Sequence, residues 1–84
     1  MEVEEIKAKI KEVIAQTTSI DPGEISDSAS FKDDLNLDSL TMLEIGVNVD
    51  FEFDLHFPEE ELGKLQTVED SVALVQKYLA KKEN

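Results

Sequence analysis

Residues 47–57 read V-N-V-D-F-E-F-D-L-H-F, with an apolar residue at every odd position and a polar residue at every even one. This alternation is typical of an amphipathic β-strand, because successive side chains of a strand point to opposite faces. The chain offers no second convincing strand to pair with it, and an isolated strand leaves its backbone donors and acceptors unpaired. The stretch therefore has to be considered as a helix as well.

On a helix, at about 100° per residue, residues 39–53 divide their apolar side chains between two opposite stripes. One stripe holds Leu40, Leu43, Val47 and Phe51, and the other holds Met42, Ile45, Gly46, Val49 and Phe53. A step of two residues turns about 200° around a helix, so the alternation distributes apolar residues to both sides. A surface helix normally needs only one apolar stripe. We therefore predict a helix over 39–53, with one stripe in the core and the other left for a partner.

The remaining sequence predicts three further helical segments and one long loop. Apolar residues at three- and four-residue steps indicate a helix over 2–17. Pro22 and Gly23 then interrupt regular structure in a long loop, whose expected core anchors are Ile20, Ile25, Ala29 and Phe31. Pro58 is expected to open a short helical turn, and 67–70 (T-V-E-D) resembles a capping box that opens the last helix. The expected fold is all-α: a four-helix bundle with a long first loop and a short third helix, in a single domain over 1–84.

The net charge of −12 is the strongest global feature, with twenty acidic residues against eight lysines. Between Lys32 and Lys64 there are ten acidic residues and no lysine or arginine. Such a surface disfavours nucleic acid and anionic membranes and favours basic protein patches or divalent cations. No apolar run approaches the roughly 18 residues of a membrane span, so we expect no membrane insertion and a cytoplasmic location. The absence of cysteine excludes disulfides and thiolate metal sites.

Residues 34–40, D-L-N-L-D-S-L, form the sharpest local motif. Asp38 or Ser39 is a suitable N-cap for the helix over 39–53. A serine at this place also presents its hydroxyl where free N–H groups and the helix dipole stabilise a phosphate ester. The single histidine, His56, is expected in a surface loop and away from Ser39, so a self-activated hydrolase is disfavoured. We predict that the chain is not an enzyme.

The acidic residues of the same motif imitate the start of a calcium-binding loop, with Asp34, Asn36 and Asp38 at its first, third and fifth positions. The rest of the motif does not match a calcium-binding loop. Ser39 stands at the sixth position, where glycine is usual, and Ile45 stands at the twelfth, where a bidentate glutamate is needed. We expect no dedicated metal site. A small divalent-cation-binding module, or a protein-interaction module without a prosthetic arm, remains the alternative function.

The stretch F-K-D-D-L-N-L-D-S-L at 31–40, preceded by D-P-G-E-I at 21–25 and followed by an acidic helix, resembles a standalone acyl carrier protein. The resemblance covers nearly the whole chain. It implies that a phosphopantetheinyl transferase moves 4′-phosphopantetheine from coenzyme A to Ser39 with the help of magnesium, which Asp38 helps to place. The terminal thiol of this arm would hold an acyl group as a thioester. Peptidyl and D-alanyl carriers are minor alternatives.

The resemblance also implies a monomer that presents acyl intermediates to enzymes of fatty acid or related acyl and polyketide biosynthesis. These would be acyl-transfer, condensing and reducing enzymes with basic docking patches. The implied partner-binding residues are Leu40, Leu43, Glu44, Val47, Asp50 and Phe51. The implied acyl-chain core is formed by Met42, Ile45, Gly46, Val49 and Phe53.

Three positions depart from the pattern of the family. Asn36 stands where glycine is frequent, but asparagine also tolerates a left-handed backbone. Gly46 replaces a larger apolar residue, and we expect it to widen the space for the acyl chain. Phe51 stands where acidic residues are common. It either contacts a more apolar partner or packs against the loop at Pro22.

Overall fold

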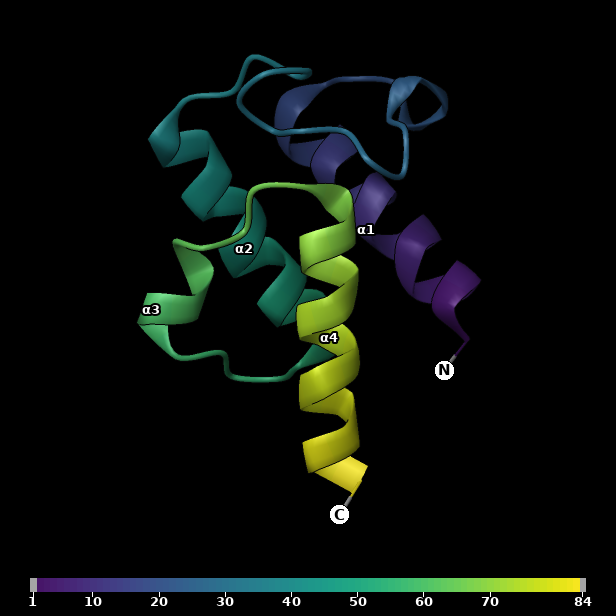
Figure 1. Ribbon diagram of the computed structural model, residues 1–84, viewed down its shortest axis with the longest axis vertical. Helices are drawn as coiled ribbons and strands as arrows, with labels where there is room; N and C mark the ends of the chain where they lie inside the picture. The colour runs from purple at the N-terminus through teal and green to yellow at the C-terminus, as the bar shows by residue number, and fades with distance from the viewer. Residues whose placement is uncertain (1, 84) are drawn as a thin grey trace.

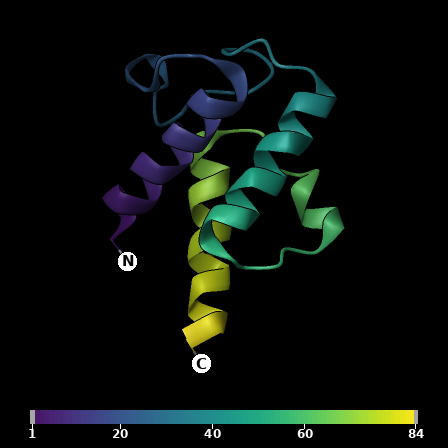
Figure 2. The same cartoon turned by 180° about the vertical axis from the view of Figure 1, so that it is seen from behind.

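A computed structural model describes residues 2–83 and shows four α-helices and one 3₁₀ turn. In chain order these are α1 (Val3–Thr18), η1 (Pro22–Glu24), α2 (Ser39–Phe53), α3 (Glu59–Leu62) and α4 (Val68–Glu83). Helices α1 and α2 lie side by side and run in opposite directions, α4 lies against the face that they share, and α3 lies beside α2 (Figures 1 and 2). The predicted four-helix fold, with its long first loop and short third helix, is confirmed. Among residues 2–83, no helix is both long and apolar enough to cross a membrane.

Helix α2 covers the range predicted from the two apolar stripes, but the alternating sequence continues beyond its end. Asp54 and His56 adopt the left-handed conformation, with φ of 54° and 58°, and are exposed. Leu55 lies between these two residues and is only 8% exposed, and Phe57 follows them and is 7% exposed. The alternation therefore encodes a helix with two apolar faces as far as Phe53, and then a loop that turns every second side chain inward.

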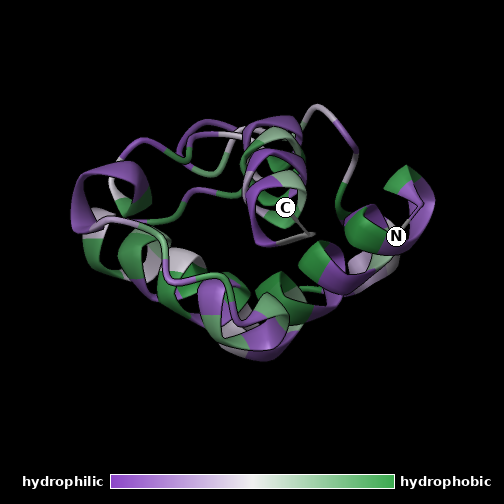
Figure 3. Ribbon diagram, turned by 90° about the horizontal axis from the view of Figure 1, so that it is seen from below, coloured by the Kyte–Doolittle hydropathy of each residue, from purple (hydrophilic) through white to green (hydrophobic). Residues whose placement is uncertain are grey.

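The core lies between α1, α2 and α4 and is built from aliphatic side chains and three phenylalanines. From α2 it receives Ile45 and Val49, both fully buried, and Phe53 at 7% exposure. Seen from below, α4 lies over the trough formed by α1 and α2, with hydrophobic residues along the inner sides (Figure 3). The long loop supplies three of its predicted anchors to the core, namely Ile25, Ala29 and Phe31, while Ile20 packs against it half-buried.

The helix ends differ from the sequence prediction by one residue. Helix α1 begins at Val3 and runs to Thr18, whose hydroxyl donates a hydrogen bond of 2.7 Å to the carbonyl of Ile14. Pro58 is the N-cap of α3 rather than its first residue. At α4 the Thr67 hydroxyl accepts from the Asp70 N–H at 3.0 Å, as in a capping box. The Asp70 carboxylate accepts in return from the Gln66 N–H at 3.2 Å, one residue earlier than in the usual box.

The long loop between α1 and α2 is held at both of its sides. The Asp27 carboxylate pairs with the ammonium groups of Lys7 at 3.0 Å and Lys11 at 2.6 Å, which ties the loop to α1. Further on, the N–H of Phe31 donates to the carbonyl of Gln66 at 2.8 Å, which ties the loop to the start of α4. The loop therefore delivers the chain to Ser39 at a fixed place.

We expect the ion pairs of Asp27 to make stability depend on pH in the acid range. Lys11 and, after it, Lys7 hold the pKa of Asp27 below its usual value of 3.8. The stabilisation is therefore fully present above about pH 4 and is lost as the pH falls through the lowered pKa. Asp27→Asn should lower the thermal midpoint at pH 7, and the difference from wild type should shrink below pH 4 and in high salt. Asp33→Asn, at an exposed and unpaired carboxylate, is the matched control. A difference that does not change with pH would contradict this account.

The turn before α2 depends on a left-handed residue at Asn36, whose φ is 56°. Asn36→Gly should leave stability nearly unchanged, because glycine adopts this conformation without a steric cost. Asn36→Val should cost about 1–2 kcal/mol, because a branched Cβ clashes there with its own backbone. Urea denaturation measures both effects. Lys32→Val, at an exposed position with negative φ, is the control, and an equal loss at both positions would refute the explanation.

Candidate functional site

Ser39 is the first residue of α2, and the sequence around it fixes its geometry. Asp38 is the N-cap in an extended conformation, and its carboxylate accepts a hydrogen bond of 2.8 Å from the N–H of Thr41. The Ser39 side chain is exposed, and within residues 2–83 its hydroxyl makes no hydrogen bond. The first amides of a helix have no intrahelical acceptor, so a phosphate ester on this hydroxyl would meet free N–H groups and the positive end of the dipole.

The carboxylate of Asp38 stays ionised beside this hydroxyl. Its hydrogen bond from the Thr41 backbone is the main cause that lowers the pKa of Asp38, with the Thr41 side chain second. Asp34, the other acid of the motif, turns away and accepts from the N–H of Ser30 at 2.7 Å. The carboxylates of Asp34 and Asp38 thus accept hydrogen bonds in two different turns and do not point to a common site. Across the described part of the chain, no group of three or more His, Cys, Asp or Glu side chains is arranged to hold a metal ion.

The outward stripe of α2 is an exposed row of large apolar side chains. Their exposures are 65% for Leu40, 41% for Leu43, 48% for Val47 and 86% for Phe51. The alternative in which Phe51 packs against the loop at Pro22 is therefore wrong. A contiguous exposed apolar row, rimmed by acids, is the usual mark of a protein-binding surface. We call these four residues the docking stripe.

The acids near the docking stripe do not all remain free, and the carboxylate of Asp50 has contacts within the chain. Its two carboxylate oxygens accept from the N–H groups of His56 at 2.7 Å and Phe57 at 2.9 Å. Asp50 thus holds the left-handed loop after α2, which the sequence did not indicate. Glu44 stays exposed, whereas Glu52 lies 3.8 Å from Lys9.

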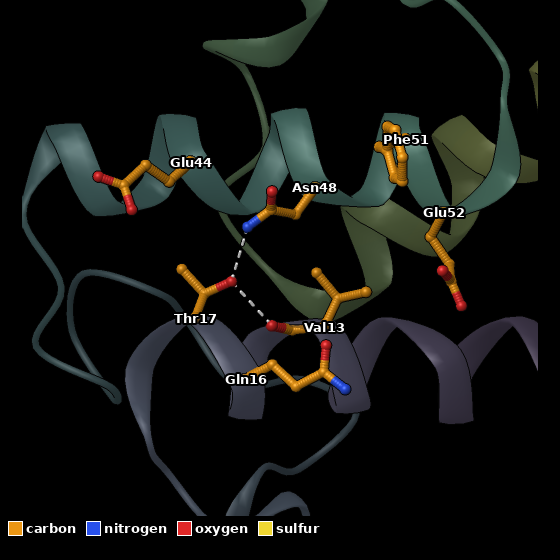
Figure 4. Close-up of a pocket in the computed structure, with 7 residues that line it drawn as sticks. All are labelled: Val13, Gln16, Thr17, Glu44, Asn48, Phe51 and Glu52. Atoms are coloured by element: carbon orange, nitrogen blue, oxygen red, sulfur yellow. Dashed lines mark hydrogen bonds between the residues drawn. The ribbon is translucent and has the colours of Figure 1, made fainter.

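A groove of about 510 Å³ separates the docking stripe from α1 (Figure 4). Its floor is polar, because the side-chain amide of Asn48 donates a hydrogen bond of 2.9 Å to the Thr17 hydroxyl across the two helices. Glu44 and Phe51 stand along its α2 side. A partner that contacts the docking stripe therefore finds a negative and polar border on this side.

A second cavity, of about 260 Å³, lies directly beside Ser39 between α2 and α3. It is lined by Ser39, Met42, Leu43, Leu62, Gly63 and Leu65. Met42, expected in the core, is only half-buried and forms part of this wall. Sequence reasoning missed Leu62 and Leu65, although Leu62 is the only apolar residue of the short helix E-E-E-L.

The expectation that Gly46 widens a space in the core also needs a correction. Gly46 is buried, and a Cβ built on it would lie 3.2 Å from the Cδ2 atom and 3.4 Å from the carbonyl oxygen of Leu62. Leu62 thus occupies the volume that a larger residue at position 46 would need. The missing side chain lets α3 pack directly on the backbone of α2.

Comparison with known proteins agrees with this arrangement. The family described as "Phosphopantetheine attachment site" matches residues 8–75. The meromycolate extension acyl carrier protein of Mycobacterium tuberculosis is 47% identical over 74 residues, which are 88% of this chain and 64% of that protein. The acyl carrier protein of Bdellovibrio bacteriovorus is 42% identical over 77 residues, which are 92% of this chain and 94% of that protein. The chain belongs to the acyl carrier protein family, and its cofactor is 4′-phosphopantetheine.

A solved structure supports the same fold. The apo doublet acyl carrier protein from prodigiosin biosynthesis matches with a TM-score of 0.76 and 25% identity, over 88% of this chain and 36% of that one. Members of the family are carriers, not catalysts, and act with a phosphopantetheinyl transferase and with biosynthetic enzymes.

Proposed function

We propose that Ser39 is the attachment residue for phosphopantetheine and that the chain presents acyl intermediates to enzymes of fatty acid or related lipid and polyketide biosynthesis. The observation that carries this proposal is the exposed Ser39 hydroxyl at the head of α2, next to the ionised Asp38. Among residues 2–83, no other serine stands at the first position of an α-helix.

The loading step is a phosphoryl transfer. The Ser39 oxygen forms a bond to the pantetheine-bearing phosphorus of coenzyme A, the pyrophosphate bond breaks, and 3′,5′-ADP leaves. The proton of the hydroxyl passes to a base on the transferase. Asp38 is suited to help hold the magnesium ion, because its carboxylate is anionic and adjacent to the reacting oxygen. Once attached, the arm supplies a thiol that holds the acyl group as a thioester.

The docking stripe gives this carrier a surface that partner enzymes can recognise. Its apolar residues offer desolvated contact area, while Glu44 and the net charge of −12 attract a basic patch. Asp50 contributes indirectly, since it fixes the loop that follows the stripe. A flexible arm on such a docked domain raises the effective concentration of its cargo at the partner's active site. The monomeric state and cytoplasmic location predicted from the sequence belong to the same proposal.

The inward stripe of α2 gives the carrier an apolar interior for its cargo. Ile45, Val49 and Phe53 are closely packed in the core, and Met42 leads from Ser39 towards them along the same face. An acyl chain attached through Ser39 can therefore leave water by entering the cavity between α2 and α3, and it would reach the packed core only if Leu62 moved aside.

Intact mass spectrometry tests the proposal. The protein is incubated with coenzyme A, magnesium and a phosphopantetheinyl transferase of broad specificity, and we expect a gain of one phosphopantetheinyl group per chain. If the mass does not increase with several such transferases, the carrier function is refuted. The alternative, an interaction module without a prosthetic arm, would then be favoured. Mass spectrometry of the protein isolated from its own cell, with cargo attached, then identifies the acyl group and thereby the pathway.

A further inference from the structure

The cavity beside Ser39 ends abruptly along α2. Met42 lines it, but Gly46, one turn further along the same face, does not. The inner surface beyond Gly46 is closed, since Val49 is fully buried and Phe53 is 7% exposed. The open space thus extends for only about one helical turn, or roughly 5 Å, from the residue that carries the cargo under the proposed function.

Leu62 is the residue that closes the cavity at this point. Its side chain both lines the cavity and lies over Gly46, where a Cβ would come within 3.2 Å of its Cδ2 atom. A Cβ at position 46 would require Leu62 to move by a few tenths of an ångström, and a larger side chain would require more. Leu62 therefore packs most closely when residue 46 is a glycine, and the pair forms a wall across the route from Met42 to Val49.

Leu62 is less buried than the residues deeper in the core, and its helix is short. It is half-buried and lies in a helix of four residues, which is too short to be stable without packing. Ile45 and Val49, by contrast, are fully buried within the fifteen residues of α2. A shorter side chain at position 62 should therefore open the route at a smaller cost in stability than a shorter side chain at Ile45 or Val49.

We propose, on the basis of the proposed attachment at Ser39, that Leu62 sets the length of the acyl chain that this protein shelters. A chain of up to roughly eight carbons fits the cavity of 260 Å³, at about 30 Å³ for each group the size of a water molecule. Carbons beyond that number remain in water, because Leu62 seated on Gly46 blocks the way into the core. The protein therefore stabilises short and medium acyl groups and gains nothing from longer ones.

The test compares thermal midpoints of loaded proteins. Wild type, Leu62→Ala and Leu62→Val are loaded at Ser39 from acetyl-, butyryl-, hexanoyl-, octanoyl- and dodecanoyl-coenzyme A, and intact mass verifies each product. Leu79→Ala is the matched control, since Leu79 is also half-buried against the core but lies on α4 and outside the cavity. Each midpoint is compared with that of the same variant carrying the unacylated arm, which removes the stability loss caused by the substitution itself.

In wild type we expect the midpoint to rise by several degrees from acetyl to octanoyl and to level off at dodecanoyl. In Leu62→Ala the thermal midpoint should keep rising to dodecanoyl. In Leu62→Val it should rise beyond octanoyl by a smaller amount. If Leu62→Ala does not fold, Leu62→Val alone tests whether Leu62 limits the chain length. Leu79→Ala should keep the wild-type break at octanoyl. A rise without a break in wild type, no dependence on chain length, or an unchanged break in both Leu62 variants would overturn the inference. Failure of loading itself would instead refute the attachment at Ser39.

Discussion

Ser39→Ala should abolish loading with phosphopantetheine while leaving the protein folded. The variant lacks the exposed hydroxyl at the first position of α2, next to the ionised Asp38. Helix α2 should still form, because its N-cap hydrogen bond comes from Asp38 to Thr41 and alanine favours a helix. Intact mass after incubation with coenzyme A, magnesium and transferase should show no gain, and circular dichroism should show the helical content of wild type.

Ser28→Ala is the control for this experiment, because Ser28 is an exposed serine of the long loop that caps no helix. It should load as wild type does. Loading of Ser39→Ala, or loss of loading in both variants, would show that the arm is attached elsewhere or that a general change of the surface is responsible.

The place of Ser39 could be predicted from the sequence because it depends on short-range rules. An N-cap residue, a serine and a following helical pattern are neighbours in the chain, and the two stripes of α2 follow from the period of the helix alone. The structure confirms both, with α2 spanning Ser39–Phe53 and the predicted stripes on opposite sides.

The contacts that the sequence did not indicate join α2 to segments that follow it in the chain and pack against it. Asp50 was counted among the docking acids, but the loop after α2 returns the amides of His56 and Phe57 to its carboxylate. Gly46 was expected to leave space, but α3 places Leu62 over it. Neither contact follows from a local pattern, because each depends on the path of a loop whose residues adopt the left-handed conformation.

Phe51→Ala, in the docking stripe, should raise the KM of a condensing or acyl-transfer enzyme for the loaded protein about 10- to 30-fold. The loss of an aromatic hot spot from an interface has an effect of this size. Phe51 is the most exposed large apolar residue, at 86%, so a partner that binds it gains the full burial of a ring. It also lies twelve residues beyond Ser39, about 18 Å along the helix axis. A contact so far from the reacting group stabilises the bound state and the transition state equally, and kcat should therefore stay unchanged.

Val3→Ala provides the matched control for Phe51, since Val3 is an exposed apolar residue at 40% exposure on α1 and away from the docking stripe. Val3→Ala should leave both KM and kcat unchanged with any enzyme that accepts the wild-type protein. Phe51→Leu should recover part of the affinity, because an apolar side chain still fills an apolar pocket. If KM rises for Leu43→Ala but not for Phe51→Ala, partners bind only the first half of the stripe. The ring of Phe51 would then have no part in docking, and the more apolar partner surface that it implies would be refuted.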